Sequence, residues 1–389
     1  MSTSESLQRR QYTADSTVPR KVRVAYVGTK AIPSQAGADR VVEAIVRGLD
    51  YSRIEPTVYC SSQLVPKDAQ IEDINIVRIR PVQGKSLHAT TLFLFSALHA
   101  LFFGRYDLIH LHNEQAAFVL PLLRLRYKVL ATSHGPATRA REKWHPVVRP
   151  LFDFVELLFV HFASRVTSVA NAHVDYYRDK YHKTVEFLPN GVEDDCEVDM
   201  AAAEEILRAH GVTLGEYILF AAGRMIPSKG CHLLLDAYRG IDSDLKVVVI
   251  GDGSHVPGYT QSLHEQADDR VRFVPFVADK AILMALIKGA RLFVFPSMVE
   301  AMSMTLLEVA SMNVPLVSSD IVENTSVLPE RALYTRAGDV EDLAEKLRWA
   351  LEHPDEMAAL AVAAQEWVYS HYRWETIIDG YESLYIELG

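Results

Sequence analysis

The sequence predicts an α/β protein with two doubly wound units, and three observations support this prediction. Apolar runs typical of buried strands alternate with segments of helical periodicity, which indicates βαβ units and parallel sheets. The alternation begins near residue 22 and begins again near residue 217. In addition, a chain of 389 residues exceeds the usual size of a single hydrophobic core. We therefore expect two domains, each built around a parallel sheet.

The first unit is predicted from strands that end in polar residues. Residues 22–28 read as a buried strand and residues 39–49 as the helix that follows it. Residues 108–112 and 129–133 read as further strands. One side of the predicted helix is apolar, with Val41, Val42, Ile45, Val46 and Leu49. Ligands of such sheets bind beyond the carboxyl ends of the strands, so we expect a site there.

The second unit repeats this arrangement. A strand is predicted at residues 217–223, followed by a helix at residues 230–238. Further strands are predicted at residues 246–251, 293–296 and 315–318. The join between the units lies near residues 193–214, and the closing stretch, residues 374–388, is amphipathic.

The composition is that of an ordinary globular protein, with 49% hydrophobic and 23% charged residues. Cys60, Cys196 and Cys231 are far apart, which argues against a disulfide scaffold or a zinc site and fits a reducing cytosol. Residues 1–20 are polar, so we expect a flexible tail and no signal peptide or membrane anchor. The most apolar stretch, residues 151–163, is too short to span a bilayer.

The net charge of −10 is unevenly distributed. Residues 1–195 hold 25 basic and 20 acidic side chains, whereas the remainder holds 15 and 30. Residues 121–150 are the most basic stretch and contain Arg124, Arg126, Lys128, Arg139, Arg141, Lys143 and Arg149 against Glu142. This stretch is either a solvated surface or a patch that faces an anionic acceptor or membrane. A nucleic-acid partner is not expected, because the chain as a whole is acidic.

Two carboxylates follow a strand of the second unit. Glu300 and Glu308 come directly after the apolar run that ends at Phe295. The first acid is expected in a turn and the second about one turn inside a helix. Ser303 is a plausible N-cap for that helix, which leaves free backbone N–H groups in the same crevice. Such a site offers donors for a phosphate and carboxylates for sugar hydroxyls.

This segment and several others, taken together, resemble the retaining glycosyltransferases of family 4, which have the two-domain GT-B fold. The matching elements run from about Val22 to Tyr385 and keep the family's order and spacing. They are Ala36-Gly37-Ala38-Asp39, Ser133-His134-Gly135, Pro189-Asn190-Gly191-Val192, Gly223-Arg224 with Ser228-Lys229-Gly230, Gly251-Asp252-Gly253, the Glu300–Glu308 segment, and His371–Trp374 with Tyr381–Tyr385. The chain departs from the family at Ala36, where glycine is usual, and at Asp39, where glutamate is usual.

The resemblance implies two Rossmann-like domains that face a central cleft. It implies an acceptor domain at residues 21–195 and a nucleotide-sugar domain at residues 196–370. The segment 371–389 would form a helix that crosses back to the first domain.

The resemblance also assigns roles to individual residues. Arg224 and Lys229 would neutralise the diphosphate of a sugar nucleotide, in place of a metal ion. Glu308 would accept the ribose hydroxyls, and Glu300 would contact the transferred sugar and stabilise positive charge at its anomeric carbon. His134 would form a hydrogen bond near the donor sugar. Backbone groups would contact the donor at Gly37, Ser303, Met304 and Thr305.

Each role has a plainer alternative. Arg224 and Lys229 could be two surface cations, and Glu308 an exposed helix residue. Glu300 could simply favour the helix dipole. A lone histidine is more often structural than functional. Of two further histidines, His112 is a weak candidate for the cleft and His110 is expected to pack.

The sequence therefore predicts a cytoplasmic, metal-independent retaining glycosyltransferase that uses a nucleotide-diphosphate sugar and no cofactor. Its acceptor would be a saccharide, a lipid-linked or a small molecule, in the biosynthesis of a glycan, envelope polysaccharide or glycoconjugate. Through residues 121–150 the protein could also contact the inner face of an anionic membrane peripherally. Two alternatives remain: a non-hydrolysing sugar-nucleotide epimerase and a catalytically silent scaffold subunit. The first domain offers no clear carboxylate set for an epimerase, and the two charged pairs argue against a scaffold.

Overall fold

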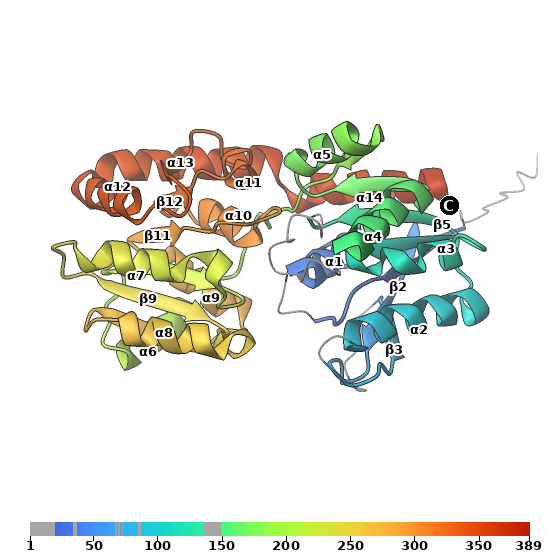
Figure 1. Ribbon diagram of the computed structural model, residues 1–389, viewed down its shortest axis with the longest axis horizontal. Helices are drawn as coiled ribbons and strands as arrows, with labels where there is room; N and C mark the ends of the chain where they lie inside the picture. Colours follow the sequence, from blue (N-terminus) through green and yellow to red (C-terminus); the bar gives the residue numbers. More distant parts are fainter. Residues whose placement is uncertain are drawn as a thin grey trace, which may run out of the picture.

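A computed structural model of the protein describes residues 20–33, 37–66, 68, 71, 73–84, 87–135 and 149–389. The described chain forms two α/β units, each with one parallel sheet between helices (Figure 1). The cores are made by the apolar strands and by the helix faces turned toward them.

The first sheet has seven parallel strands in the order β3-β2-β1-β4-β5-β6-β7. Its central strand β1 pairs with β2 on one side and β4 on the other, with Val24 opposite Pro56 and Leu108. The strands are β1 (Val22–Val27), β2 (Ile54–Ser61), β3 (Asn75–Ile79), β4 (Leu108–His112), β5 (Lys128–Ser133), β6 (Arg165–Ser168) and β7 (Glu186–Phe187). The three strands predicted here correspond to β1, β4 and β5.

Helices cover both faces of this sheet. Helix α1 begins at Gly37 and buries the apolar side that the sequence predicted, including Val41 and Ile45. The helices are α1 (Gly37–Gly48), α2 (Leu87–Phe103), the 3-10 helix η1 (Glu114–Val119), α3 (Leu120–Leu123), α4 (Arg149–Phe162) and α5 (Asn171–Tyr181).

The second sheet has six parallel strands in the order β10-β9-β8-β11-β12-β13. They are β8 (Tyr217–Ala222), β9 (Lys246–Gly251), β10 (Val271–Val274), β11 (Leu292–Phe295), β12 (Leu316–Ser319) and β13 (Leu333–Thr335). Its helices are α6 (Met200–Ala209), η4 (Pro227–Lys229), α7 (Cys231–Arg239), η5 (Gly253–His255), α8 (Pro257–Gln266), α9 (Lys280–Lys288), α10 (Met304–Ser311), α11 (Val322–Thr325), α12 (Val340–Glu352) and α13 (Pro354–His371). The predicted strands of this unit are all present, within one or two residues of their expected bounds.

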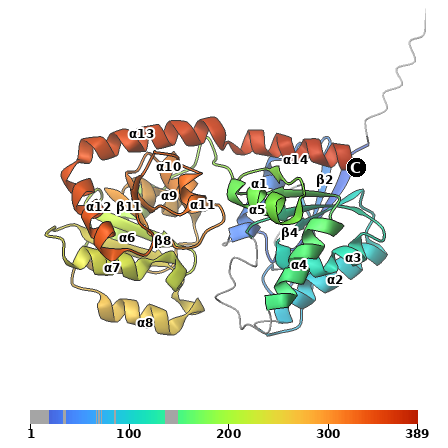
Figure 2. The same cartoon turned by 45° about the horizontal axis from the view of Figure 1, so that its top comes forward.

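The last helix, α14 (Trp374–Leu388), lies on the first unit (Figure 2). Its apolar side joins the core formed by β1, β2 and α1, and the hydroxyl groups of Tyr26 and Tyr385 are 2.9 Å apart. The chain thus crosses between the units twice, near Val192 and near Arg373. The crossings pair side by side, because the Val192 N–H donates to Tyr372 O at 2.6 Å and the Trp374 N–H donates to Val192 O at 3.1 Å.

Among the residues that the structure describes, no helix has both the length and the apolar composition needed to cross a membrane.

Candidate active site

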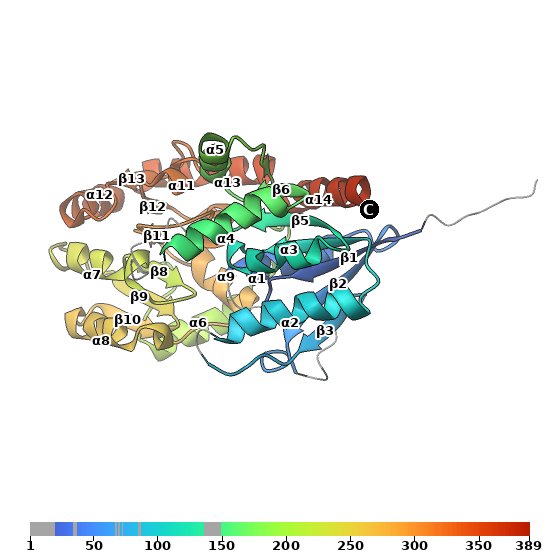
Figure 3. The same cartoon turned by 45° about the vertical axis from the view of Figure 1, so that its right-hand side comes forward.

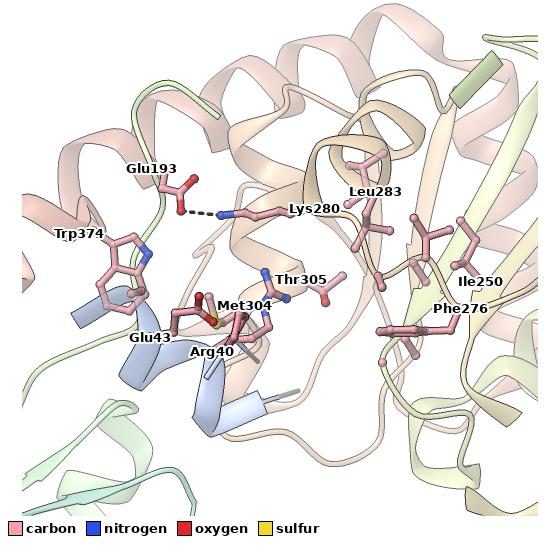
Figure 4. A pocket seen from close by; sticks show the side chains of 18 of the residues that line it. Arg40, Glu43, Glu193, Ile250, Phe276, Lys280, Leu283, Met304, Thr305 and Trp374 are labelled. Carbon is pink, nitrogen blue, oxygen red and sulfur yellow. Dashed lines mark hydrogen bonds and ion pairs between the residues drawn. The ribbon is translucent and has the colours of Figure 1, made fainter. Parts of the chain in front are cut away.

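A cavity of about 310 Å³ lies between the two units, and the carboxyl ends of β8 and β9 border it (Figure 4). Arg40 and Glu43 of α1 line it from the first unit, and Gly223, Met304 and Thr305 line it from the second. At its rim, Lys280 Nζ donates to Glu193 Oε1 at 2.6 Å. The far end is apolar and includes Ile250 and Phe276.

Lys229 and Glu300 form an ion pair within the second unit, with Nζ and Oε1 2.5 Å apart. Their loops are held together by Gly230, which has φ +77° and packs on the end of β11. A Cβ at Gly230 would lie 2.2 Å from Pro296 O, so only glycine allows this close approach. The side chains are 21% and 9% exposed, so Lys229 and Glu300 form a partly buried charged pair.

Helix α10 begins where the sequence predicted. The Ser303 hydroxyl accepts a hydrogen bond from the Leu306 N–H, so Ser303 is the N-cap. The first amides of a helix have no acceptor within it. Because Met304 and Thr305 line the cavity, this helix N-terminus offers donors and a positive dipole end to an anion there.

Glu308 lies on α10 and is buried. The alternative interpretation of Glu308 as an exposed helix residue is therefore wrong. One carboxylate oxygen is ion-paired with Arg40 of the first unit. The other, Oε2, is buried and has no hydrogen-bond partner among the described residues. Burial alone would lower the pKa of Arg40, but the charge and hydrogen bond of Glu308, together with the charges of Glu193 and Glu43, outweigh it and raise the pKa. A buried carboxylate oxygen without a donor is a ready acceptor for a ligand hydroxyl.

Arg40 is the site residue that sequence reasoning missed. It directly follows Asp39, the last residue of the loop compared with the family. Its partner is 268 positions away, so only the folded chain reveals the pair. Arg40 was also hard to find because an arginine early in an amphipathic helix is commonly a solvated residue.

Gly37 is exposed and opens α1 with φ +44°. Ala36, the departure from the family pattern, lies outside the described residues. Asp39 is partly buried and accepts a hydrogen bond from the Lys30 N–H at 3.2 Å. Burial raises the pKa of Asp39 from 3.8 to about 6.

Asp39 should make stability depend on pH. The pKa of Asp39 is higher in the folded than in the unfolded state. The contribution of Asp39 to the free energy of unfolding is therefore fully present below about pH 4 and is lost as pH rises through 6. We expect Asp39→Asn to raise the free energy of unfolding by about 2 kcal/mol at pH 8 and by much less at pH 4. Urea unfolding at both values measures this difference. Exposed Asp242 is the control, and an equal gain for Asp39→Asn at both pH values would contradict the assignment.

His134 directly follows β5 and contacts a second histidine. His134 Nε2 and His112 Nδ1 are 2.9 Å apart, with the two rings stacked. Burial lowers the pKa of His134 to about 4, so its imidazole is neutral at neutral pH. His112 is fully buried, so the suggestion that it lines the cleft is wrong. His110 packs in the interior as predicted, and its ring nitrogens form hydrogen bonds with the hydroxyl groups of Tyr385 and Thr132.

The loops that carry His134 and Glu300 meet across the cleft. A Cβ at Gly135 would lie 3.1 Å from the Cβ of Ala301. Beside this contact, Asn190 Nδ2 donates to Met302 O at 2.9 Å. The fold therefore brings together predicted residues from both units.

Arg224 stands apart from this cluster. Its side chain is exposed, and no hydrogen bond or ion pair of it is found within the described residues. The neighbouring Gly223 lines the cavity. Arg224 is thus near the site along the chain, but the structure does not join it to the Lys229–Glu300 pair.

Comparisons with known proteins agree with this geometry. Residues 36–195 match the family model described as Glycosyltransferase Family 4, and residues 202–367 match the model described as Glycosyl transferases group 1. Together they span most of the chain. A phosphatidyl-myo-inositol mannosyltransferase of Mycobacterium leprae is 25% identical over 287 residues, which are 70% of this chain and 71% of that protein.

Solved structures show the same fold. Sucrose-phosphate synthase from Thermosynechococcus elongatus superposes with a TM-score of 0.77 at 20% identity, covering 95% of this chain and 99% of that one. HepE from Anabaena, in complex with UDP and glucose, superposes with a TM-score of 0.76 at 17% identity, covering 94% and 100%. The predicted GT-B fold is confirmed.

Proposed function

Because the chain belongs to family 4 of the glycosyltransferases, we propose that it moves a sugar from a nucleotide-diphosphate sugar to an acceptor with retention of configuration. The second unit would hold the donor, and the first would present the acceptor. We further propose that the reaction needs no metal ion.

The observation that carries this proposal is the second carboxylate oxygen of Glu308. It is buried and without a hydrogen-bond donor in the described chain, and Arg40, the partner of the other oxygen, lines the cavity. Ribose hydroxyls would supply the missing donors. Arg40 holds the other oxygen and would keep the carboxylate oriented.

The diphosphate would lie between α10 and Lys229. The amides at Ser303, Met304 and Thr305 would donate to its oxygens, and the helix dipole would favour its charge. Lys229 would then exchange its partner Glu300 for the diphosphate. Arg224 would reach the same group from its exposed loop, and the backbone at Gly37 would approach it from the first unit.

The reaction would break the bond between the anomeric carbon and the diphosphate oxygen. Negative charge grows on the diphosphate, where Lys229 neutralises it, and positive charge grows on the sugar, where Glu300 stabilises it. The acceptor hydroxyl would attack on the face from which the diphosphate leaves, and its proton would pass to the departing diphosphate oxygen. With a pKa of about 4, His134 is a weak base, so its proposed role is to hydrogen-bond the sugar.

We propose an acceptor that is a saccharide, a lipid-linked molecule or a small molecule, and a role in glycan or envelope polysaccharide biosynthesis in the cytoplasm. The name of the mycobacterial relative, a phosphatidyl-myo-inositol mannosyltransferase, supports a lipid-linked acceptor. The UDP and glucose named for the HepE complex support a nucleotide-sugar donor.

A thermal-shift panel of UDP-, GDP-, ADP- and dTDP-sugars tests the donor site. Wild type, with EDTA and no added metal, is expected to gain several degrees with one nucleotide class, because a ligand that binds only the folded state stabilises it. Glu308→Ala should abolish the gain. Product NMR would then report whether the anomeric configuration is retained.

Glu345→Ala is the matched control, since Glu345 is an exposed helix glutamate of the same unit. It should keep the full shift. An unchanged shift in Glu308→Ala would remove Glu308 from the donor site. No shift with any nucleotide in wild type would favour a silent scaffold.

A further inference from the structure

Helix α2 presents an apolar surface to solvent. It carries no charged residue, although a surface helix normally has a polar outer face. Leu87, Phe95 and Phe102 lie on its outer side and are 54%, 37% and 69% exposed. Their spacing places them on one stripe that runs the length of the helix.

The neighbouring helix α4 has the same character. Leu151, Phe154 and Leu157 are 59%, 54% and 42% exposed. Helix α3 contacts both α2 and α4, so the three form one layer on the sheet (Figure 3). We call this surface the α2–α4 face, and it consists of Leu87, Phe95, Phe102, Phe103, Leu125, Leu151, Phe154 and Leu157. Soluble monomers rarely expose so large an apolar set on one layer.

The most exposed side chains gather at the end of the face away from the cleft. Phe103 is 75% exposed and Leu125 is 76% exposed. The turn after α3 is tied to the end of α2, because Arg126 donates to Leu101 O at 2.5 Å and Tyr127 donates to Ala100 O at 2.7 Å. Phe103 and Leu125 therefore project from one rigid corner.

Cations surround this corner. The exposed basic residues are Arg105, Arg124, Arg126 and Lys128. Between residues 87 and 135 the only carboxylates are Asp107, which is paired with Arg23, and Glu114, which is buried. On α4, Asp153 lies 3.9 Å from Lys180. A protein of net charge −10 thus carries a cationic, apolar corner.

We propose that the α2–α4 face docks on an anionic lipid bilayer. Aromatic and leucine side chains would enter the boundary between headgroups and acyl chains, and the guanidinium and ammonium groups would meet lipid phosphates. A second copy of the chain is a poorer occupant, since a two-fold interface there would bring like charges together.

The orientation of the helices relates the docking face to the cleft. Helices α2 and α4 follow β3 and β5, so both begin at the carboxyl edge of the sheet, where the cleft lies. A chain that rests on this face would hold its cleft at the level of the membrane surface. This proposal goes beyond the transferase reaction and does not depend on it.

Vesicle flotation of the full chain tests the proposal. Wild type should float with vesicles that contain phosphatidylglycerol, and should float less with phosphatidylcholine alone or at high salt. The double variant Phe102→Ser/Phe103→Ser should lower the partition coefficient by about a hundredfold, because two aromatic side chains no longer enter the apolar layer. Arg105→Glu/Lys128→Glu should lower it at least about fivefold.

Val322→Ser/Val362→Ser is the matched control, since both valines are about half exposed on the other unit. It should float like wild type. Equal flotation of the phenylalanine variant and wild type, or no flotation of wild type, would overturn the proposal. If light scattering shows that wild type is a dimer and the phenylalanine variant a monomer, the face is an interface between copies and the membrane proposal is wrong.

A direct readout separates contact from an indirect effect. The tryptophan fluorescence of the Phe103→Trp variant should be quenched by lipids with brominated acyl chains. The fluorescence of the Val362→Trp variant should be quenched no more than that of wild type. Equal quenching of the two variants would place the bilayer elsewhere. All variants change exposed side chains, and matching thermal unfolding would verify their folding.

Discussion

Replacing Glu300 with glutamine is expected to lower kcat by about two to three orders of magnitude. Glutamine keeps the shape and the hydrogen-bonding capacity of the side chain, but it removes the negative charge that, in the proposed reaction, would face the anomeric carbon. That charge matters most when the glycosidic bond is breaking, so the donor KM should change only a few-fold. Initial rates with saturating acceptor measure both parameters.

The variant has a structural side effect that the controls must cover. Lys229 loses its partner, which is 2.5 Å away in the wild type. Thermal unfolding should therefore be compared with Glu345→Gln, an exposed substitution in the same unit. A variant that folds normally and retains more than about a tenth of the wild-type kcat would exclude a role for the Glu300 charge in the chemical step.

Replacing Lys229 with methionine should lower kcat/KM for the donor by a similar factor, about a hundredfold or more. Methionine keeps much of the aliphatic stem and removes the ammonium group that would neutralise the leaving diphosphate. Lys229→Arg should recover part of the activity, because it restores the charge with a different shape. Donor titrations of the three proteins provide the comparison.

The double variant Lys229→Met/Glu300→Gln adds a second criterion. Two residues that act on one transition state give effects that do not add, so the double variant should lose far less than the product of the single losses. Strict additivity would mean that Lys229 and Glu300 act independently. Full activity of Lys229→Met would mean that Arg224 and the N-terminus of α10 neutralise the diphosphate without Lys229.

Much of the second unit was predictable because its signals are local. Alternation of strand and helix, the serine before α10 and the glycine after Lys229 each act over a few residues. The positions of Ser303, Glu300 and Glu308 relative to the strand and helix followed from these signals. The family resemblance then supplied roles that local patterns do not contain.

What could not be predicted depends on contacts between distant segments. The partner of Glu308 is Arg40, and no local rule joins residues so far apart. His112 sits at a strand end, where exposure is common, but it is buried against Tyr26, His110 and His134. The apolar outer side of α2 reads in the sequence like a buried helix, and only the folded layer shows that Leu87, Phe95 and Phe102 are exposed among the described residues. Arg139, Arg141 and Lys143 of the basic stretch lie outside the described residues.

The path of α14 has a consequence for synthesis on the ribosome. Trp374, Tyr381 and Tyr385 complete the core around β1 and α1, yet they follow the whole second unit along the chain. The amino-terminal unit therefore emerges first but cannot close its core until the whole second unit has left the exit tunnel. A released chain that ended shortly before residue 374 would have all the strands and helices of the second unit, but the apolar side of β1 and α1 would lack the residues of α14 that cover it. The core between β1, α1 and α14 is thus completed only after the second unit has been made, whereas the core on the other face of the first sheet contains no residue of α14.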